Sequence, residues 1–191
     1  MIYVVEGLDR CGKTTFTNYL RSMIQNPKIL VIHSSKPPAK VDPLTWTILY
    51  YGQLIDQCIN LSKDGYDIIL DRSWLGEVVY GPIYRNTNIP LRILEEQLLT
   101  NNEHFKMVVF IDNPSALVKR DDGLSLSNDL SKKEYEVTSF KAAFDASVIE
   151  SKYMFDWSHC DFSTDLLKNL AASLINGAIN ANDFGHPETT D

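Results

Sequence analysis

The most constraining feature of this sequence is a glycine-rich segment close to its beginning. Residues 7–14 read Gly-Leu-Asp-Arg-Cys-Gly-Lys-Thr, which matches the phosphate-binding loop pattern G-x-x-x-x-G-K-[ST]. The apolar run at residues 2–5 precedes this segment. Apolar residues at helical spacing follow it, namely Phe16, Tyr19, Leu20, Met23 and Ile24. This order predicts a buried strand, then the loop, then a helix that begins near Lys13.

The residue types in this loop suit the binding of a nucleoside triphosphate. Gly7 and Gly12 allow backbone angles and a close approach that a side chain would obstruct, so backbone N–H groups and the positive end of the helix can face phosphate oxygens. Lys13 brings an ammonium group to the outer phosphates, and Thr14 offers a hydroxyl to Mg²⁺. We therefore expect ATP and Mg²⁺ as cofactors, with the nucleotide bound at Gly7, Asp9, Arg10, Cys11, Gly12, Lys13, Thr14 and Thr15.

Composition and charge narrow the class of protein. The 191 residues fit one domain, and 44% hydrophobic and 23% charged residues are ordinary for a globular protein. The net charge of −7 argues against DNA or RNA as the main partner, because nucleic-acid binding needs a basic surface. A local cluster of Arg and Lys can still bind a small anion. Three cysteines without metal-ligand spacing favour reduced thiols and a cytoplasmic location, and we expect no signal peptide and no membrane span.

Apolar runs and helical periodicities alternate along the chain. Further strands are predicted at residues 28–32, 67–71, 106–112 and 153–157, and helices at 43–63, from Pro90, from Ser115, at 131–150 and at 164–176, the last two capped by Ser131 and Thr164. This alternation is typical of an α/β P-loop NTPase fold, in which a five-stranded parallel sheet carries helices on both faces. We expect one domain over residues 1–176, a lid near 119–130, and a polar, flexible tail over 177–191.

One carboxylate stands out beyond the loop. Asp71 ends an apolar run and is followed by Arg72 and Ser73. An aspartate at the end of a buried strand can complete a Mg²⁺ site with Thr14. Asp112 also ends a strand, but Asn113-Pro114 after it favours a turn and cap. A GTPase would need a guanine-reading Asn-Lys-x-Asp, which this sequence lacks.

These residues carry a resemblance to a known family. Residues 5–15 look like the phosphate-binding loop of thymidylate kinases, and Asp71-Arg72-Ser73 with Tyr80 resembles their Asp-Arg-Tyr/Ser motif and the Glu-Arg-Ser of deoxynucleoside kinases. The resemblance covers about residues 1–175 and looks closest to compact phage-type members, as judged from Gly76-Glu77 and residues 80–82. It implies a nucleoside monophosphate kinase-like fold, a nucleoside monophosphate as substrate, and a homodimer as a possible assembly.

The resemblance also implies roles for individual residues. Asp9 would hold the 3′-hydroxyl of the acceptor sugar, and Arg10 would be a catalytic arginine delivered by the loop. Asp71 would hold Mg²⁺ through water, and Arg72 would clamp the acceptor phosphate, which suits its planar, two-pronged guanidinium. Arg120, at the lid, would lie over the adenine or the phosphates of ATP. With Lys13, the residues Arg10, Asp71 and Arg72 form the expected catalytic set.

Residues 33–38 indicate whether the acceptor is a nucleoside or a nucleoside monophosphate. Phosphorylation of a nucleoside hydroxyl calls for a carboxylate base, and this stretch has none, nor the Glu-Pro usual in thymidylate kinases. A monophosphate needs positive charge instead, which Lys36, Arg72 and Arg85 can supply. We therefore favour a (deoxy)nucleoside monophosphate as the acceptor. The missing Glu-Pro weakens the expectation that its base is thymine. Two alternatives remain: a deoxynucleoside kinase with Asp71 as base, and a non-catalytic ATP-binding protein.

Several aromatic side chains could stack on the acceptor base. Trp46, Tyr50 and Tyr51 lie on the helix predicted at 43–63, and Trp74 and Tyr80 follow Asp71. Core packing is an alternative for each of them, and Lys132-Lys133 reads as a solvated helix face. The expected substrate-binding residues are Asp9, Lys36, Arg72, Trp74, Tyr80 and Arg85.

Overall fold

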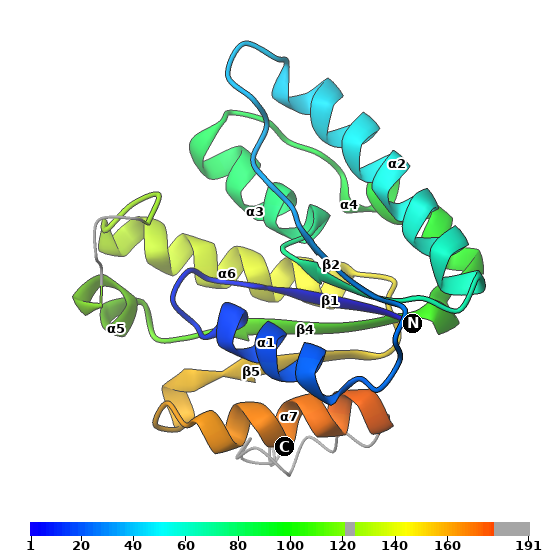
Figure 1. Cartoon of the computed structure of the whole chain (residues 1–191). Helices are drawn as coiled ribbons and strands as arrows, with labels where there is room; N and C mark the ends of the chain where they lie inside the picture. The colour runs from blue at the N-terminus through cyan, green and yellow to red at the C-terminus, as the bar shows by residue number, and fades with distance from the viewer. Residues whose placement is uncertain (121–124, 178–191) are drawn as a thin grey trace, which may run out of the picture.

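The protein is built around a five-stranded parallel sheet (Figure 1). The structure, a computed structural model, describes residues 1–120 and 125–177. Its strands are β1 (Ile2–Gly7), β2 (Ile29–His33), β3 (Asp67–Asp71), β4 (Phe105–Ile111) and β5 (Lys152–Asp156). They lie in the order β2-β3-β1-β4-β5, and all neighbouring pairs are parallel. The predicted α/β P-loop fold is confirmed.

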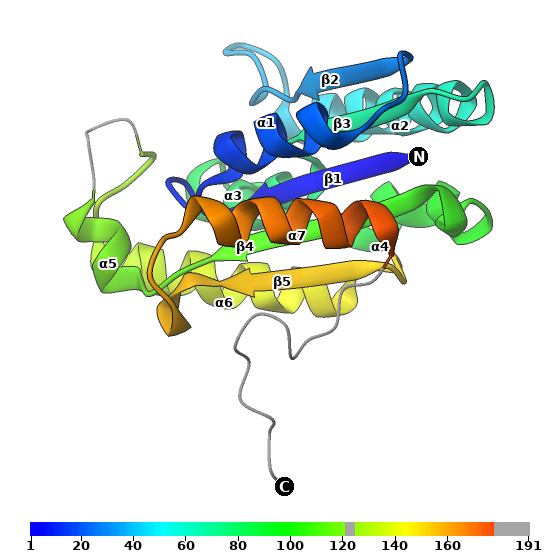
Figure 2. The same ribbon diagram turned by 60° about the horizontal axis from the view of Figure 1, so that its bottom comes forward.

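The helices cover both faces of the sheet. Helices α1 (Lys13–Met23) and α7 (Thr164–Asn176) lie together on one face, and α2 (Pro43–Lys63), α3 (Trp74–Tyr84) and α6 (Leu130–Ala146) cover the other (Figures 1 and 2). Shorter helical segments complete the structure: α4 (Leu91–Glu95), η1 (Glu96–Thr100), η2 (Asn102–His104), α5 (Pro114–Lys119) and η3 (Trp157–His159).

Burial explains why the central strands are apolar. All six residues of β1 are buried, and so are six of the seven residues of β4, because helices cover both sides of these strands. Strand β2 lies at the edge, and its Leu30 and Val31 are exposed. The carboxyl ends of β1, β2 and β3 meet at one edge of the sheet, where an open α/β sheet places its ligands.

Helix α3 was not predicted from the sequence. Gly76, Gly81 and Pro82 all lie inside it, and such residues disfavour a helix. Its N-terminus is held instead by two acceptors, since the Ser73 hydroxyl accepts from the Leu75 N–H and the buried Glu6 carboxylate accepts from the Gly76 N–H at 3.2 Å. Tertiary contacts therefore override local propensity at this helix.

Three predicted helix starts need correction by one or two residues. Asp129 rather than Ser131 caps α6, Ser163 rather than Thr164 caps α7, and Asn113 rather than Ser115 caps α5. Each of these side chains accepts from a backbone N–H of the first turn. Helix α6 also ends at Ala146, four residues before the predicted end at 150.

Parts of the predicted lid and tail lie outside the described residues. The lid prediction at 119–130 includes residues 121–124, and the tail prediction at 177–191 is described only at Gly177. Within the described ranges, no helix has both the length and the apolar character needed to cross a membrane.

Candidate active site

The phosphate-binding loop joins β1 to α1 at the centre of the sheet. Its two glycines have positive φ angles, 130° at Gly7 and 81° at Gly12. A Cβ on Gly7 would lie 2.0 Å from the backbone oxygen of Phe110 in β4. Only glycine fits where the loop leaves the sheet, because a side chain would be both strained and in collision with the next strand.

Lys13 lies inside the loop, with 7% of its surface exposed. Its Nζ donates to the backbone oxygens of Gly7 at 2.8 Å and Leu8 at 2.5 Å. Burial lowers the pKa of this amine, Arg72 lowers it further, and the nearby Asp9 and Glu6 act in the opposite direction. The side-chain nitrogen of Lys13 is therefore desolvated and held by backbone oxygens of the loop.

A cavity of about 250 Å³ opens over the loop. Arg10, which has a positive φ of 66°, lines it. The full lining is Asp9, Arg10, Gly12, Lys13, Thr14, Thr15, His33, Asp71 and Arg72. The structure thus brings the loop, the predicted catalytic arginines and the carboxylate at the end of β3 to one place.

The oxygens of this cavity suit a magnesium ion. Thr14 offers a hydroxyl and Asp71 a carboxylate, and Mg²⁺ prefers oxygen ligands while keeping several waters. His33 Nδ1 lies 3.0 Å from Asp71 Oδ2, which orients this carboxylate. Among the described residues, no group of three or more His, Cys, Asp or Glu is placed to hold a metal ion by itself. A metal held here would therefore rely on phosphate oxygens and water for its remaining ligands.

Asp9 and Arg72 form an ion pair at the edge of the loop. Arg72 Nη2 donates to Asp9 Oδ1 at 2.9 Å. Arg72 adopts a positive φ of 74°, an uncommon conformation for a residue with a side chain. Burial on its own raises the pKa of Asp9, but the charges of Lys13 and Arg72 outweigh it and hold that pKa below its ordinary value. Asp9 is therefore ionised at neutral pH.

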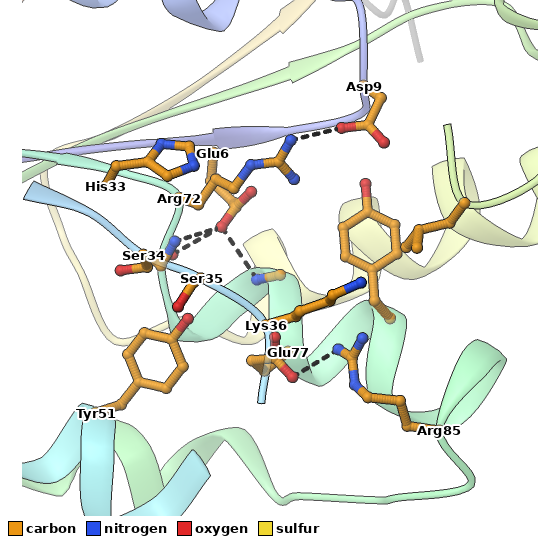
Figure 3. A pocket seen from close by; sticks show the side chains of 14 residues that line it. Glu6, Asp9, His33, Ser34, Ser35, Lys36, Tyr51, Arg72, Glu77 and Arg85 are labelled. Atoms are coloured by element: carbon orange, nitrogen blue, oxygen red, sulfur yellow. Dashed lines mark hydrogen bonds and ion pairs between the residues drawn. The ribbon is translucent and has the colours of Figure 1, made fainter. Parts of the chain in front are cut away.

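A second, larger cavity of about 310 Å³ adjoins the first (Figure 3). The two cavities share Asp9, His33 and Arg72. The remaining lining is Glu6, Ser34, Ser35, Lys36, Tyr51, Ser73, Gly76, Glu77, Tyr80, Arg85 and Leu126. Five of the six expected substrate-binding residues line this cavity: Asp9, Lys36, Arg72, Tyr80 and Arg85.

Glu6 is a residue of this cavity that the sequence reasoning missed. Its carboxylate is fully buried and accepts a hydrogen bond from the Gly7 N–H at 3.0 Å. It also accepts from the Ser73 N–H at 2.7 Å and the Gly76 N–H at 3.2 Å (Figure 3). Burial raises the pKa of Glu6, against the opposing effects of Lys13 and these hydrogen bonds. A charged residue within an otherwise apolar central strand was the available signal.

Two expectations about charged residues change in the structure. Arg85 lines the larger cavity, but its Nη2 donates to Glu77 Oε2 at 2.6 Å, so Glu77 balances the charge that was expected to meet a phosphate. Lys133 was predicted to lie on a solvated helix face, and that prediction is wrong. Its side chain is 4% exposed and donates to Glu136 Oε2 at 3.0 Å. Its neighbour Lys132 is exposed.

Of the aromatic side chains that were candidates to stack on the acceptor base, some line the larger cavity and Trp74 does not. Tyr80 and Tyr51 line the larger cavity. Trp74 lines neither cavity, and the expectation that its ring meets an acceptor base is corrected. Its side chain is fully buried, and Nε1 donates to Glu95 Oε1 at 2.9 Å. The helix that carries Trp74 turns this ring toward the core, which its position after Asp71 could not reveal.

Cys11 and Arg120 were both expected to bind the nucleotide, and neither lines either of the two cavities. The Cys11 side chain is fully buried, and its backbone oxygen accepts from Trp157 Nε1 at 2.9 Å. Burial raises the pKa of the Cys11 thiol to about 12. Arg120 pairs with Asp112 and lines neither of the two cavities. Asp112 also accepts from the Asn113 N–H, in keeping with its predicted place at a turn.

Comparison with curated proteins gives one partial match of interest, and no protein-family model matches the chain. The chain is 34% identical over 86 residues to a protein of Acidianus bottle-shaped virus (isolate Italy/Pozzuoli) named "Putative thymidylate kinase". The match covers 44% of this chain and 50% of that protein, so the chain spans about half the length of this curated relative. This similarity supports the resemblance to thymidylate kinases seen in the sequence motifs.

Several solved structures share the fold over nearly the whole chain. YorR from Bacillus subtilis, in complex with phosphorylated GDP, is 18% identical with a TM-score of 0.66 and covers 98% of this chain and 100% of its own. Thymidylate kinase from Candida albicans is 15% identical with a TM-score of 0.58, covering 92% and 91%. Deoxyadenosine kinase from M. mycoides with bound dCTP is 13% identical with a TM-score of 0.51, covering 93% and 100%. The chain has the fold of the P-loop nucleotide kinases.

Proposed function

We propose that this protein is an ATP-dependent nucleoside monophosphate kinase, similar to thymidylate kinase. One observation carries the proposal: the cavity over the phosphate-binding loop and the larger cavity beside it meet at Asp9 and Arg72. A donor phosphate at Lys13 and an acceptor phosphate at Arg72 would therefore face each other. Phosphoryl transfer requires this geometry, because most of its catalysis consists of positioning and charge neutralisation.

The residues of the chain have distinct roles in this proposal. Thr14 and Asp71 would hold the Mg²⁺ of bound Mg-ATP, which would supply the γ-phosphoryl group. Lys13 and Arg10 neutralise charge on the transferring group. Arg72 orients the acceptor phosphate, and Asp9, kept ionised by its cationic neighbours, accepts from a sugar hydroxyl.

A deoxynucleoside kinase is the second candidate, and a specific observation favours it. The stretch 33–38 has no carboxylate, but Glu6 and Glu77 from other elements line the larger cavity. A carboxylate base is therefore present in the cavity after all. Hydrogen bonds to three backbone N–H groups hold Glu6 in place, however, which suits an anchor better than a proton acceptor.

The proposal is tested by ADP release with Mg-ATP against a panel of nucleosides and nucleoside monophosphates. Turnover with monophosphates alone is the predicted result. Turnover with nucleosides alone would support the second candidate, and ATP binding without any acceptor-dependent ADP release would support a non-catalytic protein.

Substitutions of Arg72 and Lys13 test the roles proposed for these residues where the two cavities meet. Arg72→Ala should raise the acceptor KM by about 10- to 100-fold, the effect of one charged hydrogen-bonding partner, with a smaller change in the KM for ATP. Lys13→Met should abolish turnover through lost phosphate binding. Arg92 and Lys63 are exposed, so Arg92→Ala and Lys63→Met are matched controls. If Arg72→Ala leaves the acceptor KM and kcat unchanged, Arg72 does not bind the acceptor phosphate.

The proposed assembly is a homodimer, as the resemblance to thymidylate kinases implies. Exposed apolar side chains at β2 and the start of α2, Leu30, Val31, Leu44 and Leu49, are compatible with such a contact. Sedimentation equilibrium distinguishes monomer from dimer directly.

A further inference from the structure

Glu77 and Arg85 form an ion pair that the roles assigned above leave unused. Glu77 lies in α3, Arg85 caps the C-terminus of the same helix, and both line the larger cavity. Arg85 Nη2 donates to Glu77 Oε2 at 2.6 Å, and the side chains are 16% and 9% exposed for Arg85 and Glu77. A pair so deeply desolvated, and next to open space, has strict hydrogen-bonding requirements.

The pair keeps an acceptor and a donor side by side. Among the described residues, Arg85 is the one hydrogen-bond partner of the Glu77 side chain, through Oε2, which leaves Oε1 available. Arg85 Nε is buried and has no hydrogen-bond partner there either. Because both residues line the cavity, it presents a carboxylate oxygen next to the guanidinium group of Arg85.

The position of this pair suits the base of the acceptor rather than its phosphate. Figure 3 shows the Arg72–Asp9 pair on one side of the cavity and the Glu77–Arg85 pair on the other. A nucleotide whose phosphate lies at Arg72 would extend its base toward α3. The negative charge of Glu77 also disfavours a phosphate at Arg85.

We propose that Glu77 and Arg85 read the acceptor base and select bases that carry an exocyclic amino group. The inference rests on the proposed kinase function, because it assumes a nucleotide in the larger cavity. The amino N–H donates to Glu77 Oε1, and the neighbouring ring nitrogen or carbonyl oxygen accepts from the Arg85 guanidinium. Adenine, cytosine and guanine each present such an adjacent donor and acceptor.

Thymine and uracil fit this pair less well. Each has a single ring N–H that is flanked on both sides by carbonyl oxygens. A carboxylate that accepts from this N–H lies close to a carbonyl oxygen, and two acceptors then face each other in a desolvated cavity. The ring N–H and one carbonyl oxygen can still pair with Glu77 and Arg85, so the discrimination comes from repulsion between the second carbonyl oxygen and the carboxylate, which is stronger where water is partly excluded. The base preference should therefore depart from the thymine of thymidylate kinases.

The test is kcat/KM for dAMP, dCMP, dGMP and dTMP with the wild-type protein and with Glu77→Gln. At least one amino-bearing nucleotide should exceed dTMP by at least about tenfold, the discrimination of one good hydrogen-bond pair. Glu77→Gln should reduce this ratio about tenfold, because an amide offers a donor as well as an acceptor. Glu96 is exposed in η1, so Glu96→Gln is the matched control and should keep the wild-type ratio.

Two results would overturn the inference while the kinase function stands. One is a wild-type preference for dTMP, and the other is a Glu77→Gln variant that lowers kcat/KM for all four nucleotides equally, as a purely structural pair would. Calorimetric binding of the same nucleotides separates the two proposals. If the protein binds the amino-bearing nucleotides preferentially but does not turn them over, the kinase function alone is contradicted. If it neither binds nor turns over any of the nucleotides, the kinase function and the base preference are both contradicted.

Discussion

At the scale of single residues, Glu6 links the parts of the site. One carboxylate oxygen accepts from the loop residue Gly7, and the other accepts from Ser73 and Gly76 at the start of α3. A Cβ on Gly76 would lie 2.9 Å from Glu6 Oε2, so glycine at this position allows the close approach of helix and strand. The placement of Arg72, next to Ser73, therefore depends on a side chain from the neighbouring strand.

The loop glycine gives a prediction at the same scale. Gly7→Ala should destabilise the fold by at least about 2 kcal/mol, because the new Cβ meets the Phe110 backbone oxygen and the backbone has a positive φ. The matched control is Gly52→Ala in α2, where nothing lies within 4 Å of an added Cβ. This control should stabilise by about 0.5–1 kcal/mol. Urea unfolding measures both, and equal effects would contradict the account.

The base preference should depend on pH through Glu77. Burial raises the pKa of this carboxyl above its ordinary value of 4.5, Arg85 opposes that rise, and Glu6 adds to it. Protonated Glu77 can donate to a thymine carbonyl, so the ratio of kcat/KM for the favoured nucleotide over dTMP should fall as pH falls, beginning above pH 4.5. The other charged or titratable groups that line the cavity are Asp9, His33, Lys36, Tyr51, Arg72 and Tyr80.

Measuring a ratio at each pH removes most effects common to all acceptors, such as titration of their phosphates. The ratio in Glu77→Gln should stay flat over the same range. A wild-type ratio that also stays flat would mean that Glu77 does not face the base.

At the scale of elements, Glu95 ties α4 to α3 and to the end of α6. Its carboxylate accepts from Trp74 Nε1 at 2.9 Å, from the Ser147 hydroxyl at 2.8 Å and from the Val148 N–H at 2.9 Å. The side chain is 1% exposed. Buried polar contacts of this kind fix how helices are placed against one another.

Glu95→Gln should therefore destabilise the protein by about 1–3 kcal/mol. The amide nitrogen would face an N–H or hydroxyl donor that the carboxylate now satisfies, and a buried donor is left unpaired. The adjacent Glu96 is exposed, so Glu96→Gln should stay within about 0.5 kcal/mol of the wild type. Chemical denaturation gives both values, and equal stability of the two variants would show that the Glu95 contacts contribute nothing net.

At the scale of the whole molecule, the parallel sheet and the phosphate-binding loop could be predicted from the sequence. Apolar runs marked the strands, and Gly7, Gly12 and Lys13 carry their chemistry in a contiguous motif. Helix α3 could not be predicted, because one of the two acceptors that hold its N-terminus is Glu6, 70 positions earlier in the chain. Lys133 is buried and paired with Glu136 three residues further along α6, and this i,i+3 pattern could not reveal the burial, because such pairs also occur on solvated helix faces.

The candidate site shows the same limit. The sequence placed Asp71 and Arg72 at the end of a strand, and the structure brings them to the loop. The pairing of Arg85 with Glu77 and the turn of Trp74 into the core depend on α3 being a helix. Once that helix was missed, the side-chain directions along it could not be assigned.

The central claim is that the terminal phosphoryl group of ATP moves onto the phosphate of a nucleotide held at Arg72. The most direct test uses ATP with an ¹⁸O-labelled γ-phosphate, offered together with a deoxynucleoside and its monophosphate, and mass spectrometry of the products. The account predicts that the label appears in the deoxynucleoside diphosphate, and that Arg72→Ala reduces its appearance at subsaturating acceptor. Label in a newly formed monophosphate, or in inorganic phosphate alone, would contradict it.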